Sequence, residues 1–149
     1  MKPTPEGWPR LSVSMFYDDP RAAIDFLCAA FGFEVRLLVE GEGGTVEHSE
    51  ITFGEALVMV GQADSGRPGR EWARSPRTLG AATGAPCLFV DDVDAHCERA
   101  RKAGARIATE PKTSDYGDDY WSDRSYGCFD PEGHHWWFMQ RLKTGGKTA

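Results

Sequence analysis

The stretch of sequence that decides the fold of this chain is DPRAAIDFLCAAFG, residues 19–32. Its first residue, Asp19, precedes Gly32 by thirteen positions, and the same spacing separates Asp91 from Gly104. An aspartate at the start of a helix can accept hydrogen bonds from free backbone N–H groups, and a glycine suits the left-handed conformation that ends many helices. The repeated spacing therefore predicts two helices and two modules built in the same way.

Apolar residues in both stretches follow helical spacing, which predicts one apolar face on each helix. The first face consists of Ala23, Phe26, Leu27, Ala30 and Phe31, and the second, weaker one of Val93, Cys97, Ala100 and Ala103. Each helix is thus suited to pack on a sheet.

One apolar strand precedes each predicted helix and three strands follow it, separated by turns rich in glycine. The predicted strands are 11–16, 33–40, 45–53 and 56–60 in the first module, and 87–90, 106–112, 121–130 and 134–140 in the second. The fold class is therefore α+β, with two βαβββ modules. We expect one domain over residues 8–141, with module 1 at about 8–61, a linker at 62–84, module 2 at about 85–141, and a flexible tail at 142–149.

Composition and charge exclude several classes of partner. The chain has 149 residues and a net charge of −6, which argues against nucleic acid as a partner because phosphate binding needs a basic surface. The apolar runs are too short to cross a membrane, and the first residues lack the apolar core of a signal peptide. We therefore expect a cytoplasmic protein without a membrane partner. The four cysteines form no C-x-x-C pair and are expected to be reduced and mostly buried.

Three stretches of the chain resemble one known superfamily. They are YDDPRAAIDFL (17–27) with FGF (31–33), VEHSEI (46–51) with FG (53–54), and FDPEGHHW (129–136). Together they resemble the vicinal oxygen chelate superfamily, also called the glyoxalase and bleomycin-resistance fold, over about residues 8–141. The third stretch looks like the last turn and strand of the PhnB-like, metal-free branch. The superfamily includes isomerases, lyases, extradiol dioxygenases, fosfomycin-modifying transferases and proteins that sequester antibiotics, so the resemblance implies the fold and not one reaction.

The resemblance also allows a test for a metal, because metal-dependent members place four ligands at equivalent strand positions. Aligned through the Asp and Gly landmarks, those positions are Ser12, Met59, Ala85 and Trp137. Divalent metals of this kind are held by imidazole and carboxylate groups, and alanine and indole offer no lone pair. We therefore expect no bound metal and no other cofactor.

Alternation along the strands separates a face under the helices from an opposite face. The helix-facing residues are predicted to be Val13, Met15, Ile51, Phe53, Val58, Val60, Trp136 and Phe138. The opposite face is predicted to contain Ser12, Ser14, Phe16, His48, Glu50, Thr52, Leu57, Met59, Cys87, Phe89, His135, Trp137 and Met139. Aromatic and thioether groups with a few polar groups are typical of small-molecule sites. From this set, Ser12, Ser14, Phe16, His48, Met59, Phe89, His135 and Trp137 are predicted to bind a ligand.

The segment 115–126 concentrates aromatic and acidic residues, at the position of the loop that closes over the pocket in the metal-free branch. Tyr120, Trp121 and Tyr126 could stack on a planar ligand while the carboxylates select a cation. Alternatively, the aromatic rings cover the edge of the sheet or meet a second subunit, and the carboxylates pair with Arg124.

Two further groups of residues have open alternatives. His48 and Glu50 could act as general acid and base, or as non-standard metal ligands together with His135, or could simply satisfy each other and water. The linker contains Arg67, Arg70, Arg74 and Arg77, which could bind an anionic substrate or an acidic partner, or form a solvated, mobile surface loop.

These observations favour a protein that binds a small aromatic or cationic molecule in a concave pocket without a metal. The alternative is a lyase or isomerase that uses His48 and Glu50, and a third reading is an interaction module whose pocket is filled by its own side chains. Because open sheet edges and an open face favour association, we expect a homodimer.

Overall fold

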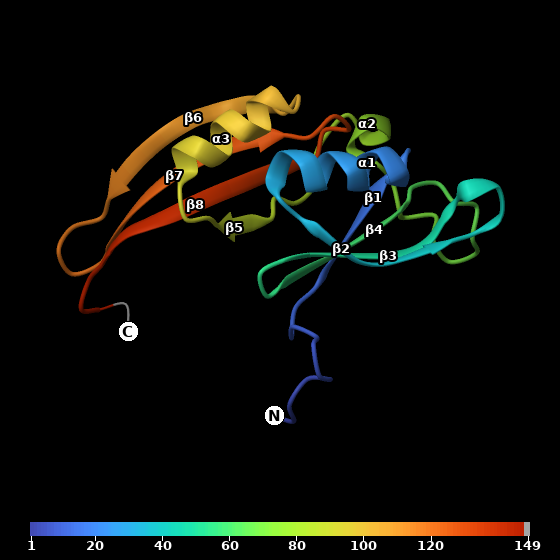
Figure 1. Ribbon diagram of the computed structural model, residues 1–149, viewed down its shortest axis with the longest axis horizontal. Coiled ribbons are helices and arrows are strands. Elements are labelled where there is room, and N and C mark those ends of the chain that lie inside the picture. The colour runs from blue at the N-terminus through green and yellow to red at the C-terminus, as the bar shows by residue number, and fades with distance from the viewer. Residues whose placement is uncertain (148–149) are drawn as a thin grey trace. The chain divides into compact units, whose positions relative to one another are not determined.

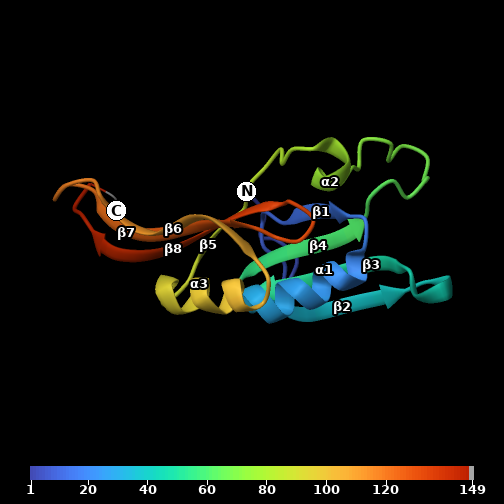
Figure 2. The ribbon, with the colours of Figure 1, turned by 90° about the horizontal axis from the view of Figure 1, so that it is seen from above.

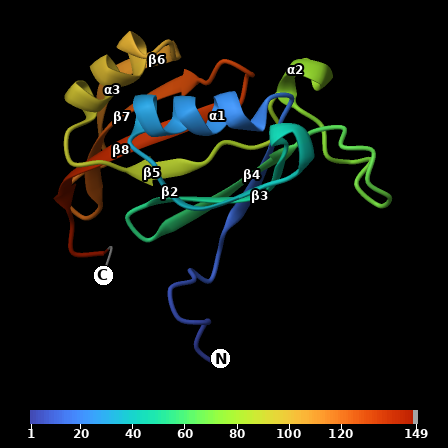
Figure 3. The ribbon, with the colours of Figure 1, turned by 45° about the vertical axis from the view of Figure 1, so that its right-hand side comes forward.

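The computed structural model describes residues 1–147. The chain divides into two compact units, here called the N-terminal unit (residues 1–80) and the C-terminal unit (from Ala81). Each contains a four-stranded sheet with a helix on one face; α1 lies along its sheet in Figures 1 and 3, and α3 along the other sheet in Figure 1.

The N-terminal unit is a βαβββ module. Its elements are β1 (Val13–Tyr17), α1 (Pro20–Phe26), the π-helical turn η1 (Leu27–Phe31), β2 (Glu34–Glu40), the short 3-10 turn η2 (Glu42–Gly44), β3 (Val46–Phe53) and β4 (Ala56–Gln62), followed by α2 (Pro76–Leu79). The strand order is β1-β4-β3-β2, with β1 parallel to β4 and the other neighbours antiparallel.

The C-terminal unit repeats this topology. Its elements are β5 (Cys87–Phe89), α3 (Val93–Lys102), β6 (Arg106–Asp115), β7 (Trp121–Phe129) and β8 (His135–Thr144). The order is β5-β8-β7-β6, again with one parallel pair, β5 and β8. The predicted α+β class and the two βαβββ modules are confirmed.

The helix caps agree with the sequence at three positions of four. The Asp19 carboxylate accepts a hydrogen bond from Ala22 N at 3.0 Å, and Gly32 and Gly104 have φ angles of 84° and 105°. The prediction for Asp91 is wrong, because Asp92 caps α3 through the backbone N–H of Ala95. The spacing from cap to glycine is therefore thirteen residues in one unit and twelve in the other, and a π-helical turn, which holds one more residue per hydrogen-bonded ring than an α-helix, accounts for the difference.

The residues under the helices form the two cores. Met15, Ile51, Val58 and Val60 are buried in the N-terminal unit, whereas Val13 and Phe53 are half-buried. Trp136 and Phe138 are fully buried in the C-terminal unit, where β8 neighbours β7. This burial agrees with the alternation read from the sequence.

Tyr126 corrects the prediction for the segment 115–126. It lies in β7 rather than in a loop, is fully buried, and stacks on Phe138 at 5.2 Å between ring centroids. Its hydroxyl lies 2.7 Å from His96 Nδ1 on α3, and burial raises the pKa of that hydroxyl. A ring enclosed in this way belongs to the core and presents no surface to a ligand.

Two other segments differ from their sequence descriptions. Strand β8 continues to Thr144, which pairs with Trp121, so residues 142–144 are part of the sheet and not of a tail that begins at 142. Residues 148–149 of the expected tail lie outside the described residues. The segment after β4, which carries α2 (Figure 2), is fixed to its own unit, since Ala63 N donates to Tyr17 O and Asp64 N donates to Ala73 O.

The cysteines are all free. Cys97 and Cys128 are buried, Cys28 is half-buried and Cys87 is exposed, so two of the four meet the expectation of burial. Among residues 1–147, no helix is long and apolar enough to span a membrane.

Candidate functional site

The face of the C-terminal sheet opposite α3 carries charged, aromatic and sulfur-containing side chains that could contact a ligand. Because Trp136 and Phe138 point toward the helix, Trp137, Met139 and Arg141 lie on the opposite side of β8. Their cross-strand neighbours on β5 and β7 are Cys87, Phe89, Asp123, Ser125 and Gly127. This set is called the β7–β8 face below.

An ion pair between Asp123 and Arg141 lies at one end of the β7–β8 face. Asp123 is only 3% exposed, and its Oδ1 accepts a hydrogen bond from Arg141 Nε at 2.5 Å. The guanidinium of Arg141 lies 5.5 Å from the ring centroids of both Phe89 and Trp121. Arg141 is therefore held by one carboxylate oxygen and by two aromatic rings.

The second carboxylate oxygen of Asp123 has no such support. Asp123 Oδ2 is buried and has no hydrogen-bond partner among residues 1–147. A buried polar atom without a partner costs free energy, and a buried carboxylate oxygen costs more than a neutral group. The site is thus prepared to accept one further hydrogen-bond donor.

Aromatic and sulfur groups surround this carboxylate. Phe89 is 55% exposed, and the Trp121 ring contacts Tyr116 and Tyr120 at 5.6 and 6.1 Å between centroids. Cys87 Sγ lies 3.0 Å from Met139 Sδ, and burial, with a smaller contribution from the Asp123 charge, raises the pKa of the Cys87 thiol. The thiol is therefore protonated at neutral pH, and the surroundings of the ion pair are largely apolar.

His135 and Trp137 lie side by side over Gly127. Their ring centroids are 5.1 Å apart, and a Cβ atom on Gly127 would come within 3.0 Å of the Trp137 ring. Burial, and then the charge of Arg106, lowers the pKa of His135, so its imidazole is neutral at pH 7. Glycine at position 127 leaves room for both rings to approach the backbone of β7.

The N-terminal unit carries a second polar cluster, on the face of its sheet opposite α1. Glu50 is buried; its Oε1 lies 3.0 Å from His48 Nε2, and its Oε2 lies 3.3 Å from Arg36 Nε. Arg36 also donates to the carbonyl of Gly7 and lies 5.1 Å from the centroid of the Trp8 ring. Both oxygens of Glu50 therefore have partners, unlike those of Asp123.

The remaining predicted residues of the N-terminal unit lie on the same side as Glu50. Ser14 is the neighbour of Met59 across the β1–β4 pair, and Ser12 precedes β1. Phe16 lies over Gly61 and meets the ring of Trp72 edge-on at 5.3 Å. The predicted ligand residues thus form two sets, one in each unit, while Tyr126 belongs to neither.

Sequence reasoning missed Asp123 and Arg141, and the alternative that the carboxylates of segment 115–126 pair with Arg124 is wrong. Arg124 binds Asp94 on α3 through two hydrogen bonds of 2.7 Å, on the helix side of β7. The signal for Asp123 was present, because it alternates with Ser125 and Gly127 on the face opposite Tyr126. Neither the pairing with Arg141 nor the unpartnered oxygen could be read from alternation alone.

Comparison with known proteins identifies the class to which this fold belongs. The model of the glyoxalase/bleomycin resistance protein/dioxygenase superfamily matches residues 11–138. The chain belongs to this superfamily.

Relatives agree with that assignment. An uncharacterised protein of Mycobacterium bovis is 34% identical over 135 residues, covering 91% of this chain and 85% of the relative. The crystal structure of TioX from Micromonospora sp. ML1 is 31% identical, with a TM-score of 0.66 and coverage of 90% of this chain and 100% of TioX. The crystal structure of UcmS2, 21% identical with a TM-score of 0.65 over 91% of this chain and 98% of UcmS2, supports the fold alone.

The four residues that the sequence comparison predicted at the superfamily's metal positions do not have the chemistry to hold a divalent metal. Ser12, Met59, Ala85 and Trp137 supply neither imidazole nor carboxylate. Within residues 1–147, no three His, Cys, Asp or Glu side chains are grouped so that they could hold an ion.

Proposed function

We propose that this protein binds a small aromatic molecule carrying an N–H donor, neutral or positively charged, on the β7–β8 face and without a metal, as a member of the PhnB-like branch. The observation that carries the proposal is the buried, unpartnered Oδ2 of Asp123. This oxygen has almost no exposed surface, so a ligand N–H would give it the donor that it lacks once the side chains above it have moved aside.

The aromatic part of the ligand is supported by the groups around the ion pair. Phe89 offers exposed ring surface, the Trp121 ring is half-buried, and the guanidinium of Arg141 can stack on a flat ring. Because Asp123 and Arg141 together are nearly neutral, hydrogen bonding and stacking contribute more to recognition than net charge does. No residue of this face is arranged as a nucleophile beside a base, which favours binding without reaction.

Asp123→Asn tests the proposal, with benzamidine as a cationic aromatic probe and benzimidazole as a neutral one. In the unaltered protein, titration followed by NMR is expected to shift the Trp121 indole N–H signal to saturation. Asp123→Asn is expected to weaken binding at least about tenfold, or about 1.4 kcal/mol, because the amide turns one acceptor into a donor.

Asp118→Asn is the matched control, since Asp118 is an exposed aspartate in the same unit that pairs with Lys143. Thermal unfolding of each variant establishes that it is folded. Equal affinity of the Asp123 and Asp118 variants for both probes, or no saturable shift with either probe, would overturn the proposal.

A second candidate is a lyase or isomerase activity in the N-terminal unit. The contact between His48 Nε2 and Glu50 Oε1 favours it, because a buried carboxylate that accepts from Nε2–H leaves Nδ1 as a proton acceptor. His48→Gln is expected to lower turnover of a substrate found by screening about 10²- to 10⁴-fold, the contribution of a general base. The fold should persist because His48 is half-exposed. Unchanged turnover in this variant excludes His48 as the base.

Association into a homodimer is proposed as well. Leu37 and Val39 are more than 40% exposed on the edge strand β2, where they neighbour Glu50 and His48. Apolar residues on an open edge favour pairing with another chain. The mass in solution of Leu37→Asp, compared with the unaltered protein, tests whether this edge is the interface.

A further inference from the structure

A tight turn after β4 presents two arginines from a fixed backbone. In the sequence Arg67-Pro68-Gly69-Arg70, the N–H of Arg70 donates to the carbonyl of Arg67 at 3.1 Å, and Gly69 has a φ of 78°. Proline in the second position and a left-handed glycine in the third are typical of a type II turn. Both arginine side chains therefore start from a defined backbone.

Three contacts hold this turn in place. Trp72 Nε1 donates to the carbonyl of Gly69 at 2.9 Å, and Gly69 N donates to the Glu71 carboxylate at 3.1 Å. The Trp72 ring in turn meets Phe16 of β1. Binding at this turn would thus order little additional backbone, which reduces the entropic cost of holding a ligand.

The arginines of this segment differ in their partners. Arg67 pairs with Glu47 of β3, Arg74 with Asp64 at 2.9 Å, and Arg77 with Asp18 at 3.7 Å. Arg70 has no carboxylate within ion-pair distance among residues 1–147. The Arg70 guanidinium is therefore available to form hydrogen bonds to an anion.

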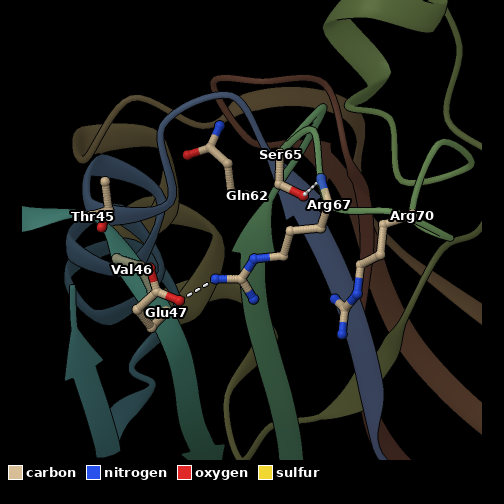
Figure 4. A pocket seen from close by; sticks show the side chains of 7 residues that line it. All are labelled: Thr45, Val46, Glu47, Gln62, Ser65, Arg67 and Arg70. Carbon is tan, nitrogen blue, oxygen red and sulfur yellow. Dashed lines mark hydrogen bonds and ion pairs between the residues drawn. The ribbon is translucent and has the colours of Figure 1, made fainter. Parts of the chain in front are cut away.

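Arg70 and Arg67 line the same cavity, which Figure 4 shows from close by. It has a volume of about 190 Å³ and is lined by Thr45, Val46, Glu47, Gln62, Ser65, Arg67 and Arg70. In Figure 4 the Arg67 side chain extends toward the carboxylate of Glu47, and Arg70 lies on the other side of Arg67. The cavity thus already contains an ion pair between the Glu47 carboxylate and the Arg67 guanidinium.

We propose that this cavity binds the oxyanion of a small molecule, a carboxylate or a phosphate, between Arg70 and Arg67. Guanidinium groups form paired hydrogen bonds to such anions. Residues 62–80 contain four arginines against Asp64 and Glu71, although the chain as a whole has a net charge of −6. This local positive charge draws small anions to the turn.

Glu47 makes the proposal unusually testable, because it occupies Arg67 as a competitor. An incoming anion shares Arg67 with Glu47 or displaces it, whereas Arg70 is open from the start. Removing the charge of Glu47 therefore strengthens anion binding, and removing the charge of Arg70 weakens it. A nonspecific change in surface charge gives effects of the same sign, so a site is recognised by effects that are larger than those of the same charge change at a distant exposed residue.

The test uses the full chain, with inorganic phosphate and succinate as separate probes titrated at constant ionic strength, since screening weakens exposed ion pairs. The amide signals of Gly69 and Arg70 and the indole N–H of Trp72 report binding by NMR. We expect saturable shifts, about tenfold weaker binding in Arg70→Gln and about threefold tighter binding in Glu47→Gln. The probe that binds more tightly identifies whether the natural anion is a phosphate or a carboxylate.

Lys102→Gln is the matched control, because it removes one positive charge from an exposed position in the other unit. Equal weakening by Arg70→Gln and Lys102→Gln, weaker binding in Glu47→Gln, or no saturable shift with either probe would each overturn the proposal. Its outcome is separate from that of the proposed function, which concerns the C-terminal unit and aromatic probes.

Discussion

Replacing Asp130 by alanine is expected to lower the free energy of unfolding by about 3–5 kcal/mol, because each buried donor that loses a charged acceptor costs about 1–3 kcal/mol. The buried Asp130 carboxylate accepts hydrogen bonds from two backbone N–H groups and one indole N–H. Its Oδ1 accepts from the backbone N–H groups of Glu132 and His134 at 3.0 Å, and its Oδ2 accepts from Trp136 Nε1 at 3.1 Å. One side chain thus fixes the last turn and the first core residue of β8.

Urea unfolding followed by circular dichroism measures this effect. Asp115→Ala is the matched control, because its exposed carboxylate accepts one backbone N–H, that of Gly117, in a turn of the same unit. The control is expected to cost less than about 1 kcal/mol, in line with a single exposed hydrogen bond. A loss for Asp130→Ala as small as that of the control would show that the carboxylate does not stabilise the turn.

Replacing Trp136 by alanine is expected to cost about 3–5 kcal/mol, the usual range for deletion of a large buried aromatic side chain. Trp136 is 0% exposed and lies nearly parallel to Phe138, with an angle of 12° between the rings. Trp72→Ala is the comparison, because Trp72 is 67% exposed and its removal should lower the free energy of unfolding much less. Similar losses at the two positions would contradict the assignment of Trp136 to the core.

The combined variant of Asp130 and Trp136 tests their hydrogen bond directly. Once the indole is removed, the carboxylate has one donor fewer to satisfy, so the two losses should not add. A total smaller than the sum by about 0.5–3 kcal/mol is the range expected for residues in contact. Full additivity would indicate that the bond to Trp136 Nε1 contributes nothing to stability.

The fold was predictable because its signals are local. Apolar periodicity, glycine turns and the two aspartate-to-glycine spacings gave the type and order of the principal helices and strands. The choice between Asp91 and Asp92 as the helix cap could not be read locally, because either aspartate can cap a helix. It depends on where the chain leaves β8: Val90 N still donates to Met139 O, so the helix begins after Asp92. The C-terminal end of β8 was missed for a related reason. The polar residues near Thr144 lack an apolar signal and are in the sheet because β7 pairs with them.

The sites were less predictable than the fold. Alternation placed Trp137 and Phe89 on one face, but the pairing of Asp123 with Arg141 depends on the register of β7 against β8. Tyr126 was placed in a loop although the expected strand 121–130 already contained it, and its neighbour in the structure, Phe138, is across the sheet. Side-chain contacts between neighbouring strands cannot be predicted from a single stretch of sequence.

The π-helical turn at the end of α1 has a consequence for how the two halves of the chain are compared. Strands β2 and β6 both begin two residues after their glycines, at Glu34 and Arg106, although the first half has one more residue between cap and glycine. The first half thus has one more helical residue than the second, and the strand that follows still begins two residues after its glycine. A comparison of this part of the two halves therefore needs a gap of one residue within the helix, at residues 27–31, and not in the connection to the next strand.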